Sequence, residues 1–91
     1  MSVENSQIDP VVIVSAKRTA MGGFMGELSS LKTTELGSAA IKAAVERSGV
    51  APDQVEEVIM GCVLPAALGQ APARQASLGA ELPLSTGCTT I

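Results

Sequence analysis

Residues 58–64 read Val-Ile-Met-Gly-Cys-Val-Leu and are followed by Pro65. This run contains no charged residue, and its apolar side chains do not alternate with polar ones. A short apolar run without alternation predicts a strand that is buried on both faces, as the strands of a parallel sheet are. Proline has no N–H to donate to a sheet, so the predicted strand ends at Pro65.

A helix is predicted on the N-terminal side of this strand, and another strand precedes the helix. The helix begins at Thr33 or Thr34, whose hydroxyls can cap it, and ends at about residue 48, just before Gly49. Residues 11–14, Val-Val-Ile-Val, are a β-branched run without alternation and also predict a strand. Strand, helix and strand predict a right-handed βαβ unit, and therefore an α/β fold.

A second helix and a third strand are predicted on the C-terminal side. The helix begins near residues 71–72 and ends at Gly79, and the threonine-rich strand covers residues 85–91. Residues 50–53 predict a short helical turn, and the glycine-rich residues 17–31 predict a loop.

The chain has 91 residues, enough for one small domain. Residues 1–9 are polar and predict a loose N-terminal segment, and residues 10–91 predict the domain. The apolar content of 46% is that of a globular protein, but Phe24 is the only aromatic residue. The core is therefore expected to consist of Ala, Val, Ile, Leu and Met side chains.

Charge and hydropathy exclude several classes of function. The net charge is −3, and the basic residues are scattered without aromatic residues between them, which argues against nucleic-acid binding. No apolar run reaches the length of a membrane span, and the N-terminus lacks the apolar region of a signal peptide. We therefore expect a cytoplasmic protein that binds neither nucleic acid nor membrane.

The chain contains Cys62 and Cys88 but no histidine. The cysteines are not spaced as zinc ligands, so no metal site is expected. A Cys-His or Ser-His catalytic couple cannot form within the chain. Both cysteines are interpreted as small buried strand residues. The alternative is a small enzyme that uses Cys88 directly, and the missing histidine argues against it.

Several stretches, taken in order, resemble the thiolase family. Residues 12–24 resemble the opening of thiolases, except that Ala20 stands where most members have proline. Residues 69–76, Gly-Gln-Ala-Pro-Ala-Arg-Gln-Ala, are the most specific match. The remaining matches are residues 34–37, residues 58–64, and residues 82–83 and 88–91, the last two following as they do in acetyl-CoA acetyltransferases. Blocks in this order cover nearly the whole chain.

The resemblance implies a thiolase-like α/β fold, the N-terminal βαβ portion of a layered αβαβα architecture. It implies part of an acetyl-CoA C-acetyltransferase of fatty acid metabolism, which condenses two acyl-CoA units or cleaves a 3-ketoacyl-CoA through a cysteine acyl-enzyme. In that family the nucleophilic cysteine would lie just beyond Ile91. No catalytic or cofactor-binding residue is therefore expected in this chain, which is expected to be inactive alone. No cofactor is implied, because coenzyme A thioesters are the substrates.

The resemblance also implies partners. It makes Arg74, Gln75, Thr89 and Thr90 candidates for a subunit interface, in a homodimer or homotetramer. For Arg74 and Gln75, structural hydrogen bonding is preferred over catalysis. The remainder of the same polypeptide is expected to complete the domain, because residues 10–91 stop before the nucleophile motif. Acyl-CoA is the implied substrate.

The segment before the first predicted helix holds two weaker candidate sites. Lys17 and Arg18 could meet a phosphate of coenzyme A, but the resemblance places no such contact there, and a solvated or interface role is preferred. Gly22, Gly23 and Gly26 give the pattern G-G-x-x-G, which lacks the order of a phosphate-binding loop. A flexible connection is the preferred interpretation of these glycines.

An alternative to a thiolase part is a small α/β structural or interaction module without chemistry. Such a module would fold as a soluble monomer of 91 residues, whereas a thiolase part would be insoluble or unfolded when made alone. The sequence stops inside the third predicted strand and leaves sheet edges uncovered, which favours the thiolase part.

Overall fold

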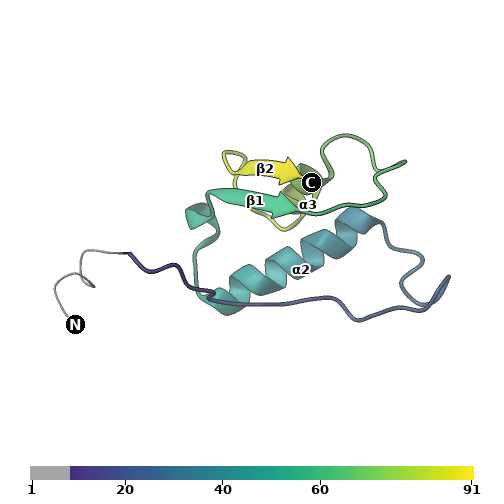
Figure 1. Ribbon diagram of the computed structural model, residues 1–91, viewed down its shortest axis with the longest axis horizontal. Helices are drawn as coiled ribbons and strands as arrows, with labels where there is room; N and C mark the ends of the chain where they lie inside the picture. The colour runs from purple at the N-terminus through teal and green to yellow at the C-terminus, as the bar shows by residue number, and fades with distance from the viewer. Residues whose placement is uncertain (1–8) are drawn as a thin grey trace.

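The computed structural model describes residues 9–91 and has an α/β arrangement (Figure 1). Its elements, in chain order, are α2 (Thr33–Ser48), the 3-10 turn η1 (Pro52–Gln54), β1 (Glu57–Met60), α3 (Pro72–Gly79) and β2 (Gly87–Thr90). The α/β class, both helices and the short turn after the first helix are as the sequence predicts. The loose N-terminal segment predicted for residues 1–9 lies almost wholly outside the described residues.

β1 and β2 form a parallel two-stranded sheet, and α3 lies in the connection between them. Met60 and Thr90 are the last pair of partners in the register. The ladder continues one step further, because Ile91 N donates to Met60 O at 2.9 Å and Cys62 N donates to Ile91 O at 2.8 Å. Parallel strands need a crossover connection, which α3 and its flanking loops provide.

The ends of α2 follow from local chemistry. Lys32 N donates to the Oε1 atom of Glu35 at 2.7 Å, so an acidic side chain in the first turn satisfies the backbone at the helix start. The prediction that a threonine hydroxyl caps this end is wrong, because Thr33 and Thr34 lie within the helix and Lys32 occupies the N-cap position. Gly49 ends the helix in the left-handed region, at φ 78°, as the sequence predicts.

Small residues let α2 pack closely against α3. A Cβ atom on Gly37 would lie 3.1 Å from Ala76 Cβ, and a Cβ atom on Gly79 would overlap with the side chain of Ser38. The hydroxyl of Ser38 also donates to Ala76 O at 2.8 Å. Close contact between small residues thus takes the place of large aromatic side chains in this packing.

Val58 of β1 forms a buried hydrophobic cluster with Ala80 and Leu82, on the face of the sheet that the helices cover. The half-buried side chains packed against it are Ile41, Val45, Val55, Met60 and Cys88. The expected aliphatic composition of the core is therefore confirmed, and the one aromatic residue, Phe24, is exposed.

The first predicted strand does not form. Residues 11–14 are extended and exposed, and no backbone hydrogen bond joins them to another segment within residues 9–91. A strand needs a hydrogen-bonded neighbour, and this segment instead reaches only the C-terminal end of α2, where Val14 lies in a groove with Val45 and Ser48 (Figure 1). The βαβ unit predicted from residues 11–14 and 58–64 is therefore wrong, and the observed unit is β1–α3–β2.

The other strands are shorter than predicted. β1 covers residues 57–60 rather than 58–64, and β2 covers 87–90 rather than 85–91. Val58 is buried whereas Ile59 is exposed, so within the described residues the helices cover one face of the sheet. No helix in residues 9–91 is both long and apolar enough to cross a membrane.

Candidate functional site

The carboxyl ends of both strands meet the N-termini of both helices at a small cavity of about 30 Å³. The residues that line it are Thr33, Thr34, Gly37, Met60, Gly61, Cys62, Pro72, Ala73, Ala76 and Thr90. In open α/β sheets, ligands bind outside the carboxyl ends of the strands. This end of the sheet is therefore the candidate site, although the cavity has room for a water molecule and not for a substrate.

Thr90 joins β2 to α3 at this end of the sheet. Its Oγ1 atom accepts a hydrogen bond from Ala73 N at 3.0 Å. The first N–H groups of a helix have no partner within the helix, so a threonine on a neighbouring strand here supplies one. The last residue of β2 and the first turn of α3 are thereby held as one unit.

Arg74 fixes the chain that leads into β2. Its Nη2 atom donates to Leu84 O at 3.0 Å, and its Nη1 atom donates to Thr86 O at 3.5 Å. Thr86 is itself buried, and its hydroxyl donates to Val55 O at 3.0 Å, next to β1. The guanidinium of Arg74 therefore makes backbone contacts that set where β2 begins.

Gln75 fixes the loop that follows β1. Its Nε2 atom donates to Leu68 O at 2.7 Å and to Gln70 O at 2.8 Å. The same loop contains left-handed backbone at Ala67, Gly69 and Ala71, with φ values of 64°, 81° and 49°. Hydrogen bonds from one carboxamide thus stabilise a connection whose backbone is strained at its alanines.

The structure brings three of the four sequence-predicted interface residues into hydrogen-bonding roles. Arg74, Gln75 and Thr90 all contact backbone groups of this chain, whereas Thr89 is exposed on β2. Ser38 and Thr86 were not predicted from the sequence, and the hydroxyls of both donate to backbone carbonyls across the core. The available signal was the position of each beside apolar stretches, where a polar side chain needs a partner.

Cys62 and Cys88 are half-buried, and no disulfide is found in residues 9–91. The thiol of Cys88 donates weakly to Thr86 O at 3.5 Å, and its side chain packs on the hydrophobic cluster. Cys62 lines the small cavity. The described part of the chain contains no group of His, Cys, Asp and Glu residues that could hold a metal ion.

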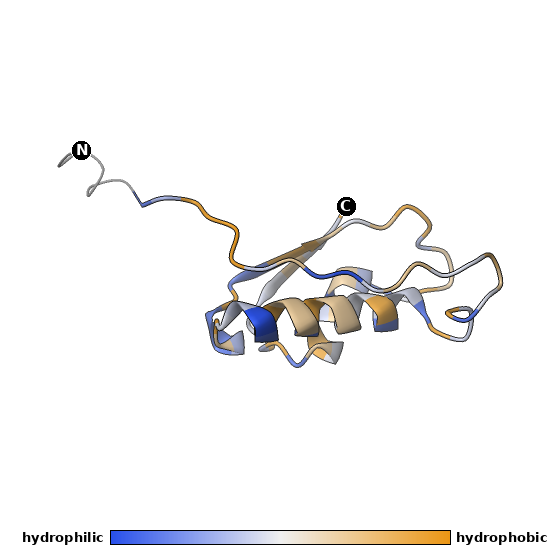
Figure 2. Cartoon of the chain, turned by 90° about the horizontal axis from the view of Figure 1, so that it is seen from below, coloured by the Kyte–Doolittle hydropathy of each residue, from blue (hydrophilic) through white to orange (hydrophobic). Residues whose placement is uncertain are grey.

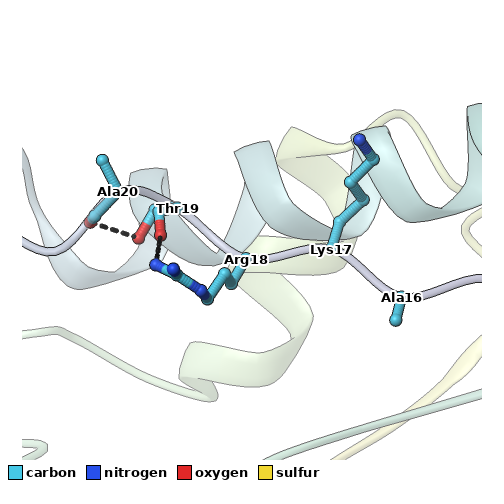
Figure 3. Close-up of a pocket in the computed structure, with 5 residues that line it drawn as sticks. All are labelled: Ala16, Lys17, Arg18, Thr19 and Ala20. Atoms are coloured by element: carbon cyan, nitrogen blue, oxygen red, sulfur yellow. Dashed lines mark hydrogen bonds between the residues drawn. The ribbon is translucent and has the colours of Figure 1, made fainter.

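Lys17 and Arg18 lie on an open hollow of about 690 Å³ formed by residues 16–20. Their side chains point away from one another (Figure 3), and Arg18 Nη1 donates to Thr19 O at 3.0 Å. Two cations that diverge do not hold a common phosphate. The structure therefore gives no support to a phosphate site at this pair.

The glycines of residues 22–26 form a turn, in which Gly26 N donates to Gly23 O at 3.0 Å. The next helix begins only at Thr33. Phosphate loops place their glycines directly before a helix N-terminus, so this turn is not one of them. The sequence interpretation of these glycines as a connection is consistent with this geometry.

Residues 11–91 match the family model described as the N-terminal domain of thiolase. The chain belongs to the thiolase family. A crystal structure of the Acat5 thiolase from Ascaris suum in complex with coenzyme A has the same fold, with a TM-score of 0.85 and 44% identity. The match covers 87% of this chain and 21% of that thiolase chain.

Curated relatives give the same result. The mitochondrial acetyl-CoA acetyltransferase of Xenopus tropicalis is 60% identical over 89 residues, which are 98% of this chain and 21% of the relative. The human mitochondrial enzyme is 54% identical over 89 residues, and acetyl-CoA acetyltransferase 2 of Arabidopsis thaliana is 55% identical over 93. The chain thus spans about a fifth of the length of these relatives.

The relatives bear on the expected location as well. Those from Xenopus and human are named mitochondrial, so the expectation of a cytoplasmic protein is not supported by them.

Proposed function

We propose that this chain supplies scaffold and subunit interface to an acetyl-CoA C-acetyltransferase. The contact that carries the proposal joins Thr90 Oγ1 to Ala73 N at 3.0 Å. It makes β2 and α3 one rigid unit at the carboxyl end of the sheet, where α/β proteins bind ligands. Arg74 and Gln75 extend that unit to the chain before β2 and to the loop after β1.

The proposed reaction proceeds in two steps through a cysteine outside residues 1–91. The thiolate attacks the thioester carbon of a first acyl-CoA, the new C–S bond forms, and coenzyme A leaves as its thiol after protonation. An α-proton of acetyl-CoA then passes to a base, and the carbanion attacks the acyl-enzyme, which releases the 3-ketoacyl-CoA and the cysteine. Splitting a difficult transfer in this way is the usual benefit of a covalent intermediate.

No metal or prosthetic group takes part in these steps, and the coenzyme A thioesters are substrates. The developing oxyanion of each step needs positioned hydrogen-bond donors, which contribute the largest share of such rate accelerations. The residues of this chain would not donate to the oxyanion themselves. They would contribute indirectly, by fixing the end of β2 and the start of α3.

The proposal includes a homodimer or homotetramer in which β2 lies at the subunit interface. One edge of β2 pairs with β1, and within residues 9–91 no strand covers the other edge. An uncovered edge is a template for another strand. Thr89 is exposed on β2 and would face the partner, whereas the hydroxyl of Thr90 is already engaged by Ala73.

The remaining parts of the proposal concern the setting of the enzyme. The enzyme would take part in fatty acid metabolism, and its substrate would be acyl-CoA. Its location follows the relatives, several of which are named mitochondrial.

The proposal is tested by co-expressing this chain with the part of the X. tropicalis relative that it does not match. We call the resulting complex the reconstituted thiolase. Cleavage of acetoacetyl-CoA by coenzyme A is expected only when both polypeptides are present. A soluble, cooperatively folding 91-residue monomer that neither binds the second polypeptide nor restores cleavage would contradict the proposal and favour a non-catalytic module.

A further inference from the structure

Residues 61–71 form the loop that leads from β1 to α3, at the carboxyl end of the sheet. Two of its large apolar side chains, Val63 and Leu64, are 92% and 81% exposed. Figure 2 shows hydrophobic residues on this loop, beside the C-terminus. Burial of these side chains therefore does not hold the loop in place, and its course depends on hydrogen bonds.

The first end of the loop is bonded to the end of β2. Cys62 N donates to Ile91 O at 2.8 Å, and Ile91 N donates to Met60 O at 2.9 Å. Ile91 is thus held through both its N–H and its C=O group. The direction in which a polypeptide leaves β2 depends on these two hydrogen bonds, and one of them comes from the loop.

The other end of the loop is bonded to Gln75 of α3. The Nε2 atom of Gln75 donates to Leu68 O at 2.7 Å and to Gln70 O at 2.8 Å. A Cβ atom on Gly69 would lie 3.2 Å from this Nε2 atom, so glycine leaves the carboxamide room to reach both carbonyls. The two strained alanines of the loop flank this point, and strain of that kind persists only where the surrounding structure holds it.

Little else in the described part of the chain holds the loop between these two ends. From Cys62 to Leu68, the one backbone hydrogen bond within the loop runs from Leu68 N to Pro65 O, at 3.2 Å. The position of Cys62 beside Ile91 therefore depends on where Gln75 fixes residues 68–70.

We propose that Gln75 is a positioning residue for the thiolase reaction, an inference that rests on the proposed function. By holding residues 68–70, it keeps Cys62 N on Ile91 O and sets the direction in which the polypeptide leaves β2. The resemblance to thiolases places the cysteine nucleophile just beyond Ile91. A shift of about 1 Å in a reacting group can lower a rate about 100-fold, so the effect of Gln75 falls on kcat and not on the binding of acyl-CoA.

The test uses a continuous chimera, in which residues 1–91 are joined to the part of the X. tropicalis relative that follows the matched residues. An unbroken chain after Ile91 is needed, because the inference concerns the exit from β2. Gln75→Glu keeps the size of this exposed side chain and replaces its donor with a carboxylate, which cannot donate to the two carbonyls. Gln70→Glu is the matched control, because it adds the same charge to the same loop and the side chain of Gln70 bonds to no other residue of 9–91.

Three quantities are measured for each variant. In Gln75→Glu, kcat for acetoacetyl-CoA cleavage is expected to fall about ten-fold, while KM changes by less than about two-fold. The amide of Cys62 is expected to exchange about ten-fold faster than in the unmodified chimera, with the amides of α2 as the check that the fold is intact. In Gln70→Glu, all three quantities are expected to stay within about two-fold of the unmodified chimera.

Several outcomes overturn the inference. They are an equal loss of kcat in both variants, a rise in KM at unchanged kcat in Gln75→Glu, and a loss of kcat without faster exchange at Cys62. An unchanged kcat in Gln75→Glu despite faster exchange overturns it as well. A folded chimera that cleaves no acetoacetyl-CoA contradicts the proposed function, and the exchange at Cys62 then still decides whether Gln75 holds the exit from β2.

Discussion

Thr90 Oγ1 lies 3.0 Å from Ala73 N and accepts its hydrogen bond, so the last residue of β2 caps the first turn of α3. Caps usually come from the residue just before a helix, and the residue in that position, Ala71, has no polar side chain. The cap therefore comes from a residue 17 positions along the chain, and it couples strand to helix at the carboxyl end of the sheet.

Replacing Thr90 with valine keeps the shape of the side chain and removes the acceptor. Ala73 N then lacks its partner, and the variant is expected to lose about 1 kcal/mol of stability. The urea midpoint of the reconstituted thiolase and hydrogen exchange at the start of α3 measure the loss. Thr90→Ser retains the hydroxyl and is expected to recover most of it. Equal urea midpoints for Thr90→Val and Thr90→Ser would show that this hydrogen bond does not stabilise the protein.

Gly79→Ala is expected to destabilise the protein by about 1–3 kcal/mol, because the new methyl group overlaps with Ser38 of α2. Replacing Ser38 with glycine as well makes room for the methyl group. A double-mutant cycle on urea midpoints should then show a coupling of about 0.5–3 kcal/mol in the direction of rescue. Strict additivity of the two changes would contradict the close packing of α2 on α3.

Glu81→Gly is expected to stabilise the protein by about 0.5–1 kcal/mol. Glu81 has φ 68°, a left-handed conformation that glycine adopts without steric cost. The change removes the ion pair to Lys42 at 3.3 Å, but its side chains are 48% and 74% exposed, and such pairs contribute little. Lys42→Ala is the control, with an expected change within about 0.5 kcal/mol. A lower melting temperature for Glu81→Gly would show that the ion pair outweighs the backbone cost.

Thr86→Val should lower stability by about 1–2 kcal/mol. The hydroxyl of Thr86 is buried and donates to Val55 O at 3.0 Å, and valine leaves that carbonyl without this donor. The same change at exposed Thr89 serves as the matched control and is expected to stay within about 0.5 kcal/mol. Comparable urea midpoints for both variants would argue that the buried hydrogen bond is replaced by packing.

The sequence predicts the helices better than the strands, for a physical reason. The end of α2 at Gly49 and the span of α3 depend on local chemistry that a short window contains. The strand predicted at residues 11–14 depends on a neighbour, and the described chain offers it none. Strand formation is a pairing property, so an intrinsic β-propensity is not sufficient to decide it.

The candidate site was only partly predictable. The pattern of residues 69–76 pointed to Arg74 and Gln75, and both make structural hydrogen bonds. The role of Thr90 as the cap of α3 could not be predicted, because it requires the register that places Thr90 beside Met60 and near the start of α3. Contacts of this kind join residues far apart in the sequence, and they form only when the paired strands bring those residues together.

The most direct test of the account is the rate of acetoacetyl-CoA cleavage by the reconstituted thiolase, measured beside each polypeptide alone. The account predicts cleavage by the complex and none by either polypeptide alone. This chain has no histidine to activate a cysteine nucleophile, and the second polypeptide lacks the scaffold that this chain supplies. Equal cleavage by the second polypeptide without this chain would contradict the proposed role.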